Sequence, residues 1–303
     1  MQSATPPPAP PRRAWIGLLM ASLGALGFSG KAIIVKLGYR HGADAITLLG
    51  LRMLFALPLF LGLAWWAGRG KAPLVRRDWL AVAGLGFSGY YLASFLDFAG
   101  LAYISASFER LILYLNPTLV LLLGWLLLGR RVGGRQLLAL GVSYAGVLWV
   151  FAQELHWQGE HVWLGALLVL GSALSYALYL LYSGEEVHRL GAMRLTGLAT
   201  SVACVLCVAQ YLLLRGPSAL LQVPDAVVQL SLLNALLSTF VPVLLVMLAI
   251  ERLGAAVAAQ TGMLGPMATI ALGAWLLDEP LTAGVLGGTV LVLGGILLLN
   301  RWR

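Results

Sequence analysis

Long apolar segments follow one another along almost the whole 303-residue chain, and they constrain its fold more than any other feature. Most are about 20 residues long, the length that an α-helix needs to cross the hydrocarbon core of a bilayer. We distinguish ten of them, at residues 15–37, 45–67, 79–101, 107–128, 134–151, 162–183, 194–214, 226–249, 255–277 and 282–299. The sequence therefore predicts an all-α integral membrane protein with ten transmembrane helices.

The low content of charged residues supports this prediction. Charged residues make up 11% of the chain and hydrophobic residues 60%, whereas a soluble domain carries about 25% charged residues. A soluble enzyme is thus disfavoured, and so is a nucleic-acid-binding protein, because the net charge of +8 has no soluble face on which to form a basic patch. Cys204 and Cys207 lie inside an apolar segment without histidine partners, and the glycines form no phosphate-binding loop. We therefore predict no metal site and no cofactor.

The distribution of positive charge predicts how the helices are oriented. Of the 20 lysine and arginine residues, 14 fall in segments on the side of the N-terminus, 3 fall on the opposite side, and 3 lie within the spans or at a span edge. Cytoplasmic loops of membrane proteins are enriched in lysine and arginine. We therefore predict a multi-pass protein of the plasma (inner) membrane with both termini in the cytoplasm. The proline-rich residues 1–13 would form a disordered tail, and residues 301–303 a short cytoplasmic end.

The two halves of the chain repeat one pattern. Pro117 matches Pro266, and Gly146 matches Gly295, at the same offset of 149 residues. The predicted repeats are residues 14–152 and 161–300. Each repeat holds five helices, which is an odd number, so the second repeat would enter the membrane from the opposite side. Inverted repeats of this kind are typical of secondary transporters, whose substrate site lies near the bilayer midplane between the halves.

Four short motifs occur at fixed places among these helices. They are Arg52 inside the second helix, residues 102–106 (Ala-Tyr-Ile-Ser-Ala) entering the fourth, residues 116–118 (Asn-Pro-Thr) within it, and residues 277–281 (Leu-Asp-Glu-Pro-Leu) leaving the ninth. With the repeat, they resemble the drug/metabolite transporter superfamily of the EamA type, over about residues 14–300. The chain departs from that family at Arg130, where a glutamate is usual. The resemblance implies an inner-membrane exporter, often of amino acids or other small metabolites.

Five charged residues are predicted to lie in the outer half of the membrane: Lys31, Arg52, Asp97, Glu109 and Arg110. Charges inside a bilayer are costly, so such residues are by default candidates for function. The five leave one net positive charge, which suits a zwitterionic or anionic substrate whose carboxylate is attracted to Arg52 or Lys31. The alternative is a purely structural set of ion pairs, such as Arg52 with Asp97 and Glu109 with Arg110. If protons drive transport, Asp97 or Glu109 is the predicted carrier.

Polar side chains on the same helices extend this candidate site. We predict that Tyr90, Tyr114, Asn116 and Tyr179 line the substrate cavity together with Lys31, Arg52 and Asp97. Pro117 and Pro266 each remove a backbone hydrogen bond from a helix, and we predict that they act as hinges between the halves. Proline is also simply common in membrane helices, which is the alternative explanation.

The sequence therefore predicts a secondary active transporter that exports a small metabolite, amino-acid-like or otherwise zwitterionic or anionic, by alternating access, with proton coupling as one option. Its partners would be a small-molecule substrate, the lipid bilayer and, if coupled, protons; the sequence does not indicate an oligomeric state. Two alternatives remain: an integral membrane enzyme acting on lipid-linked substrates, and a non-transporting membrane scaffold. An enzyme would need clustered carboxylates or histidines, whereas a scaffold would tolerate alanine at Lys31, Arg52 and Asp97.

Overall fold

A computed structural model describes residues 11–129, 131–253, 261 and 264–301. Throughout this part of the chain the ordered elements are helices, and no strand occurs among the described residues. The expected disordered tail therefore lies outside the described residues up to position 10. Most of the first half of the expected ninth helix, residues 254–260, 262 and 263, also lies outside them.

The first repeat holds seven α-helices and one π-helical segment. They are α1 (Pro11–Arg40), α2 (Ala45–Gly68), α3 (Arg76–Leu85), the π-helical η1 (Gly86–Leu92), α4 (Ala93–Leu101), α5 (Ala106–Leu113), α6 (Asn116–Leu128) and α7 (Gly134–Gln158). Since α3, η1 and α4 are continuous, they make one crossing. The pair α5 and α6 makes another, so the first repeat crosses five times as expected.

The second repeat follows the same order. Its elements are α8 (Val162–Leu190), α9 (Ala192–Arg215), the short 3₁₀ helix η2 (Pro217–Gln222), α10 (Asp225–Ala235), the π-helical η3 (Leu236–Phe240), α11 (Val241–Leu253), α13 (Leu264–Leu276) and α14 (Ala283–Arg301). Across the described residues, nine helical stretches are long and apolar enough to cross a membrane, and α13 is a shorter apolar helix. The predicted all-α membrane fold is confirmed.

Several helix boundaries differ from the sequence prediction, among them those of α1, α7 and the fourth crossing. Helix α1 begins at Pro11, because proline is well suited to the first turn of a helix, so the tail ends earlier than residue 13. Helix α7 runs on to Gln158 instead of ending at 151, which places Glu154 inside a helix. The fourth crossing is broken between Leu113 and Asn116, just before Pro117, whose missing N–H cannot continue the ladder of hydrogen bonds.

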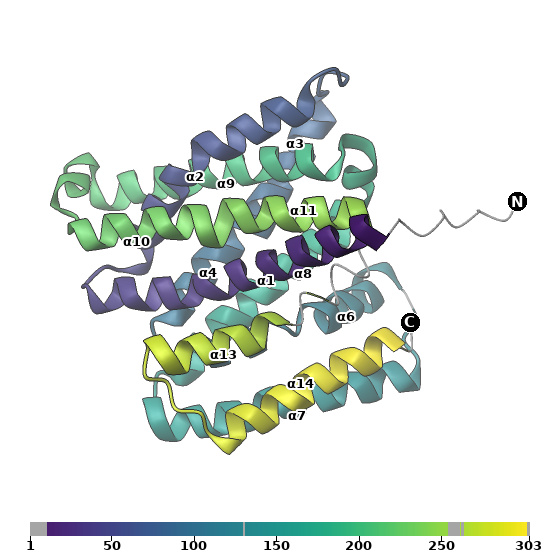
Figure 1. The fold of residues 1–303 in the computed structure, drawn as a ribbon, viewed down its shortest axis with the longest axis vertical. Helices are drawn as coiled ribbons and strands as arrows, with labels where there is room; N and C mark the ends of the chain where they lie inside the picture. Colours follow the sequence, from purple (N-terminus) through teal and green to yellow (C-terminus); the bar gives the residue numbers. More distant parts are fainter. Residues whose placement is uncertain (1–10, 130, 254–260, 262–263, 302–303) are drawn as a thin grey trace, which may run out of the picture.

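Helices from the two repeats pack in matched pairs. The second helices of the repeats, α2 and α9, lie together at one edge of the bundle, and the fifth helices, α7 and α14, lie together at the other (Figure 1). Helix α4 of the first repeat packs on α8 of the second, and α11 packs on α1 in the corresponding way. The start of α1 and the end of α14 lie on the same side of the bundle (Figure 1).

Small residues allow the closest of these contacts. A Cβ atom added at Gly288 of α14 would lie 2.3 Å from a methyl carbon of Val150 and 2.9 Å from the carbonyl oxygen of Gly146, both on α7. Close approach of backbones at glycine is the usual way in which membrane helices associate, because lipid offers no hydrophobic drive. Glycine at these positions is therefore required by the α7–α14 contact.

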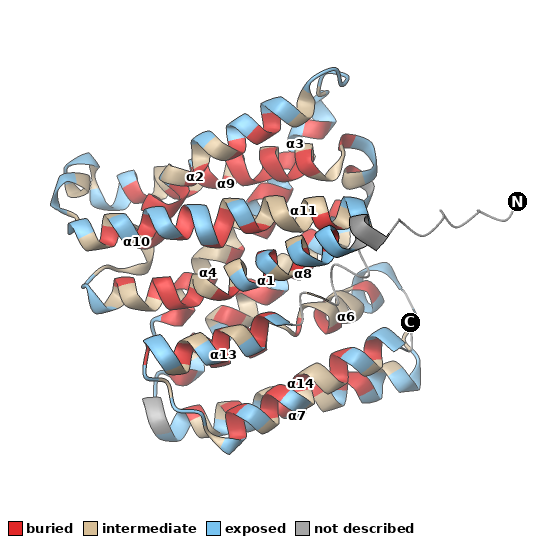
Figure 2. Cartoon of the chain, in the orientation of Figure 1, coloured by how far each residue is buried: buried red, intermediate tan, exposed pale blue. Residues whose placement is uncertain are grey.

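The outer surface of the bundle is apolar. Exposed faces alternate with buried faces along each helix (Figure 2), and the exposed positions include Leu213, Trp275 and Val290, which are 85%, 77% and 70% exposed. Water would be a poor solvent for so many exposed apolar side chains, whereas lipid is a good one. The surface agrees with a bundle that is solvated by a bilayer along its length.

The third crossing of each repeat contains a π-helical segment, which the sequence did not predict. These segments are η1 in the first repeat and η3 in the second. The repeat offset of 149 residues carries Phe87 onto Leu236 and Tyr91 onto Phe240, so the two segments occupy the same place in their repeats. Wide turns of this kind occur frequently at functional sites.

Candidate functional site

Lys31 of α1 lies between two buried carboxylates. Its Nζ atom is 2.9 Å from Glu109 Oε1 on α5 and also forms an ion pair and hydrogen bond with Asp97 Oδ2 on α4. The side chain of Lys31 is 14% exposed, that of Asp97 is 4% exposed, and that of Glu109 is fully buried. One ammonium therefore serves two carboxylates in a setting that water barely reaches. We call Lys31, Asp97 and Glu109 the charged triad.

Arg52 of α2 is buried beside the triad but has a neutral partner. Its Nε donates a hydrogen bond to Thr239 Oγ1 of η3 at 2.7 Å, and its guanidinium lies over the ring of Phe98, 5.1 Å from the ring centre. The Arg52–Asp97 ion pair that illustrated the structural alternative does not form between these side chains, because Lys31 pairs with the Asp97 carboxylate. The Nη1 atom of Arg52 and the Oδ1 atom of Asp97 are both buried and have no hydrogen-bond partner among the described residues.

Arg110 of α5 repeats this arrangement with a threonine of α13. Its Nε donates to Thr269 Oγ1 of α13 at 3.0 Å, and its Nη2 donates to the carbonyl oxygen of Phe28 on α1. The Glu109–Arg110 ion pair of the structural alternative does not form between these side chains, because successive residues of a helix point in different directions. Two arginines of the first repeat thus each donate to a threonine hydroxyl of the second repeat.

The break between α5 and α6 lies close to Gly265 of α13. A Cβ atom at Gly265 would come within 2.8 Å of the Tyr114 hydroxyl oxygen, and its carbonyl oxygen accepts a hydrogen bond of 2.9 Å from Ser29 Oγ. Asn116 Oδ1 is buried without a hydrogen-bond partner among the described residues. Of the expected site residues, Tyr114 and Asn116 therefore lie at the interface where α1, α13 and the break meet.

The structure does not bring Tyr90 and Tyr179 to the triad. Their hydroxyl oxygens are 3.2 Å apart, and Tyr176 stacks on Tyr179 with ring centres 5.5 Å apart. These three tyrosines belong to a separate apolar cluster, between η1 and α8, that includes Leu195. Neither of the two cavities that we describe is lined by the expected binding residues, so the charged groups are packed together in this conformation.

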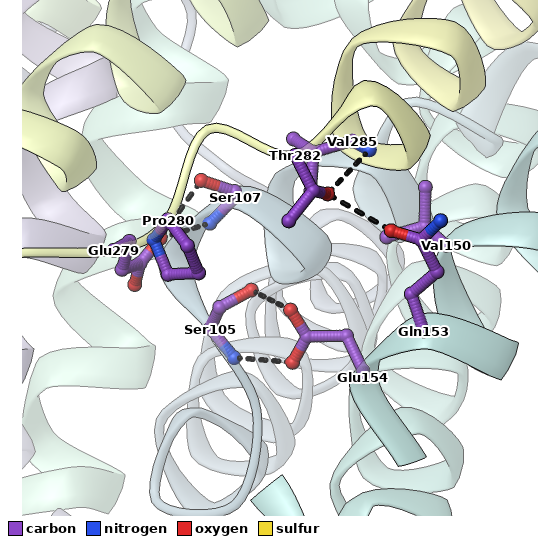
Figure 3. Close-up of a pocket in the computed structure, with 9 residues that line it drawn as sticks. All are labelled: Ser105, Ser107, Val150, Gln153, Glu154, Glu279, Pro280, Thr282 and Val285. Carbon is purple, nitrogen blue, oxygen red and sulfur yellow. Dashed lines mark hydrogen bonds between the residues drawn. The ribbon is translucent and has the colours of Figure 1, made fainter. Parts of the chain in front are cut away.

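Two carboxylates that the sequence analysis did not select meet at the start of α5 (Figure 3). Glu279, from the segment between α13 and α14, accepts hydrogen bonds from the backbone N–H groups of Ala106 and Ser107, at 2.7 and 3.2 Å. Glu154 of α7 accepts from the hydroxyl and backbone N–H of Ser105. Carboxylates at this position satisfy N–H groups that the helix leaves free, and they complement its dipole.

These two carboxylates line a cavity of about 120 Å³, together with Gln153, Thr282 and neighbouring residues. Thr282 Oγ1 donates to Gln153 Oε1 at 2.9 Å, which joins the same loop to α7 (Figure 3). Glu279 could have been found, because it belongs to the motif at residues 277–281. Glu154 was missed because the predicted fifth helix ended three residues before it.

Comparisons with known proteins agree with the fold. The model of the family described as "EamA-like transporter family" matches residues 15–152 and 163–301, once for each repeat. The chain is 31% identical to the "Uncharacterized transporter YcbK" of Bacillus subtilis over 285 residues, covering 89% of this chain and 88% of that protein. It is 30% identical to the "Uncharacterized protein PA1977" of Pseudomonas aeruginosa, covering 93% of each chain. A solved crystal structure shares the fold, with a TM-score of 0.63, 16% identity and coverage of 95% of this chain and 98% of the other.

The fold and these matches define a multi-pass membrane transporter rather than a membrane enzyme. Within that class, the chain belongs to the EamA-like transporter family. The expected resemblance is thereby confirmed, and the reading as an enzyme on lipid-linked substrates is set aside.

Proposed function

We propose that this transporter exports a small zwitterionic metabolite, amino-acid-like in its charges, across the plasma (inner) membrane by alternating access. The observation that carries the proposal is a pair of buried atoms without hydrogen-bond partners among the described residues, Arg52 Nη1 and Asp97 Oδ1. A buried polar group that lacks a partner costs free energy unless something supplies one. A substrate with a carboxylate and an ammonium supplies both partners.

The charges around these two atoms favour the same class of substrate. Asp97 directly precedes Phe98, whose ring lies under the Arg52 guanidinium, yet the bonded partner of Asp97 is Lys31. The substrate carboxylate would bind Arg52, and its ammonium would bind Oδ1 of Asp97, the oxygen that Lys31 leaves free. With Arg110 included, the five buried charges leave one net positive charge, which also admits a purely anionic substrate.

Alternating access would use the interface between the repeats. Arg52 and Arg110 each reach from the first repeat to a threonine of the second, so a shift of one repeat against the other would change both contacts. Pro117, at the break in the fourth crossing, and Pro266, near the start of α13, are the proposed hinges. The proposed orientation inserts the two repeats in opposite senses, with both termini in the cytoplasm.

Proton coupling would act through the triad. Because Lys31 is shared by Asp97 and Glu109, protonating either carboxyl leaves Lys31 fully available to the other, so the triad can exchange a proton without an unpaired charge. Export would then be driven by proton entry, with Asp97 or Glu109 as the carrier. If Asp97→Asn retains transport that depends fully on a proton gradient, Asp97 is excluded and Glu109 remains.

The test is a flux assay in inverted membrane vesicles with a panel of radiolabelled amino acids, nucleosides and carboxylates, with and without a proton gradient. We expect gradient-dependent flux of at least one amino-acid-like compound, its loss in Arg52→Gln, and partial retention in Arg52→Lys. Arg135→Gln, which changes an exposed arginine at the start of α7, is the matched control. If no compound of the panel shows gradient-dependent flux, the exporter proposal fails. If alanine at Lys31, Arg52 and Asp97 leaves flux unchanged, these residues are not the site.

A further inference from the structure

A second cavity lies at the opposite end of the bundle from the Glu154–Glu279 cavity, where α2 ends and α9 begins. Its volume is about 320 Å³, and it is lined by Trp66, Ala67, Lys71, Gly191, Ala192, Met193, Arg194 and Glu251. The residues come from the end of α2, the turn between α8 and α9, and the end of α11. None of them belongs to the charged triad or to its arginines.

Two cations of this cavity are held in place by backbone carbonyl groups. Arg194 Nη1 donates a hydrogen bond of 3.1 Å to the carbonyl oxygen of Ala72, and Lys71 Nζ donates one of 3.4 Å to the carbonyl oxygen of Leu190. Both bonds therefore join the segment after α2 to the junction between α8 and α9, and each segment supplies one donor and one acceptor. Each cation is thereby positioned without its charge being neutralised.

Gly191 makes room for one of these cations. It has a backbone φ of +86°, and an added Cβ atom would lie 2.8 Å from Lys71 Nζ. Gly68 does the same for the other, since an added Cβ would lie 3.4 Å from Arg194 Nε. Glycine on both sides lets the two positive groups face the same cavity.

The third charged group of the cavity has the opposite sign. Glu251 lies near the end of α11 and is exposed. Within the described part of the chain, no ion pair joins Lys71, Arg194 or Glu251 to another side chain. The cavity thus presents two unneutralised positive charges and one unneutralised negative charge.

The depth of the cavity indicates a lipid headgroup as the occupant. Helix α2 ends at Gly68, two residues after Trp66, whose side chain is 57% exposed on the outside of the bundle. Tryptophan at the end of a span marks the level of the headgroups, and basic pockets between helices at this level bind the phosphates of anionic lipid headgroups. The cavity therefore lies where a lipid phosphate is available.

We propose that this cavity binds a phospholipid whose headgroup carries both a phosphodiester and a primary ammonium, as phosphatidylethanolamine does. The phosphate would bind Lys71 and Arg194, and the ammonium would bind Glu251. A purely anionic headgroup such as phosphatidylglycerol gains the first contact but has no ammonium to pair with Glu251, so it leaves that carboxylate facing the lipid phosphate without a counter-charge. A choline headgroup has an ammonium without N–H groups and cannot donate a hydrogen bond to that carboxylate.

Native mass spectrometry of the full-length, delipidated protein tests this proposal, with phosphatidylethanolamine, phosphatidylglycerol and phosphatidylcholine as probes. Since one charge near a membrane surface changes binding roughly fivefold, we expect phosphatidylethanolamine to bind about fivefold more tightly than the other two lipids. Glu251→Gln should remove that preference. The double variant Lys71→Gln/Arg194→Gln removes two charges and should weaken binding of all three lipids about 25-fold, and Lys71→Arg/Arg194→Lys should restore it.

Matched controls come from charged residues outside the cavity. Arg76→Gln, at the same end of the bundle, and Glu160→Gln, at the other end, should leave lipid binding unchanged, since both residues are exposed and line neither cavity. Equal or tighter binding of phosphatidylglycerol, or a preference that survives in Glu251→Gln, would overturn the proposal. So would failure of the charge-retaining variant to bind. The assignment to a lipid is overturned if soluble phosphorylethanolamine also binds and its binding is weakened by the same substitutions of Lys71, Arg194 and Glu251.

Discussion

Replacing Lys31 by methionine should destabilise the protein strongly, because the change leaves two buried carboxylates without their shared counter-charge. At an effective dielectric constant of about 20, two unit charges separated by the 2.9 Å between Lys31 Nζ and Glu109 Oε1 attract by about 6 kcal/mol, before desolvation is subtracted. Removing one partner of a buried pair costs about 3–5 kcal/mol in measured cases. We expect a cost in that range for Lys31→Met.

Thermal unfolding of the purified protein in detergent measures this cost. For a large chain, each kcal/mol lowers the unfolding temperature by roughly 2–4 °C, so Lys31→Met should unfold about 6–20 °C below the wild type. The triple variant Lys31→Met/Asp97→Asn/Glu109→Gln should recover at least half of the loss, because it removes the uncompensated charges. Acidification should also narrow the gap between Lys31→Met and the wild type, because protonation neutralises the carboxylates.

Lys36→Met is the matched control. Lys36 lies on the same helix and is also partly buried, but no ion pair involves it among the described residues. The carboxylates of Glu279 and Glu154 act on Lys36 without forming an ion pair with it, so its replacement should lower the unfolding temperature much less than Lys31→Met does. The reasoning is refuted if Lys31→Met unfolds at the same temperature as the wild type, or if the triple variant is no more stable than Lys31→Met.

Three further predictions concern contacts away from the triad. Glu279→Ala should lower the free energy of unfolding by about 1–2 kcal/mol, since it removes the acceptor for the first N–H groups of α5. Its control is Asp278→Asn, at the exposed neighbouring position, which should leave the unfolding temperature unchanged in the same thermal assay. Gly288→Leu should prevent α7 and α14 from packing, because even a Cβ atom there would lie 2.3 Å from a side-chain carbon of α7. The prediction is contradicted if size-exclusion chromatography gives as much folded monomer for this variant as for the wild type. Partial burial alone would raise the pKa of the Asp44 carboxyl, but hydrogen bonds from α2 and from Arg215 lower it. The ionised Asp44 carboxylate therefore stabilises the folded protein at neutral pH, and this stabilisation is lost as the pH falls below about 4, through the depressed folded pKa. In Asp44→Asn, the free energy of unfolding should fall by a few tenths of a kcal/mol less between neutral and acidic pH than it does in the wild type.

The spans were predictable from the sequence because a bilayer imposes one length and one polarity on every crossing. The two repeats followed from prolines and glycines held at one offset, and the family matches on both halves agree with that reading. The limits of helices were less certain, since propensity changes little between residue 151 and the true end of α7 at Gln158. That error of seven residues hid Glu154.

The five intramembrane charges were predictable individually, but their partners were not. Estimates of depth place residues along the membrane normal and say nothing about which helix faces lie opposite each other. Lys31 is 66 residues from Asp97 and 78 from Glu109 along the chain, and only the packing of α1 against α4 and α5 brings them together. Tyr90 shows the same limit, because it shares the third crossing with Asp97 and yet packs against Tyr179 of α8 instead of the triad.

The two π-helical segments have a consequence for the ancestry of the chain. A π-turn holds one residue more than an α-turn, since its hydrogen bond joins residues five apart. Segments η1 and η3 stand at the same place in their repeats, while Gly146 and Gly295 keep the 149-residue offset downstream. Two insertions made separately after duplication would have had to occur in the same turn of both copies. A single insertion in an ancestral five-helix gene, copied when that gene duplicated, needs only one event, and under that history the wide turn would be older than the two-repeat chain.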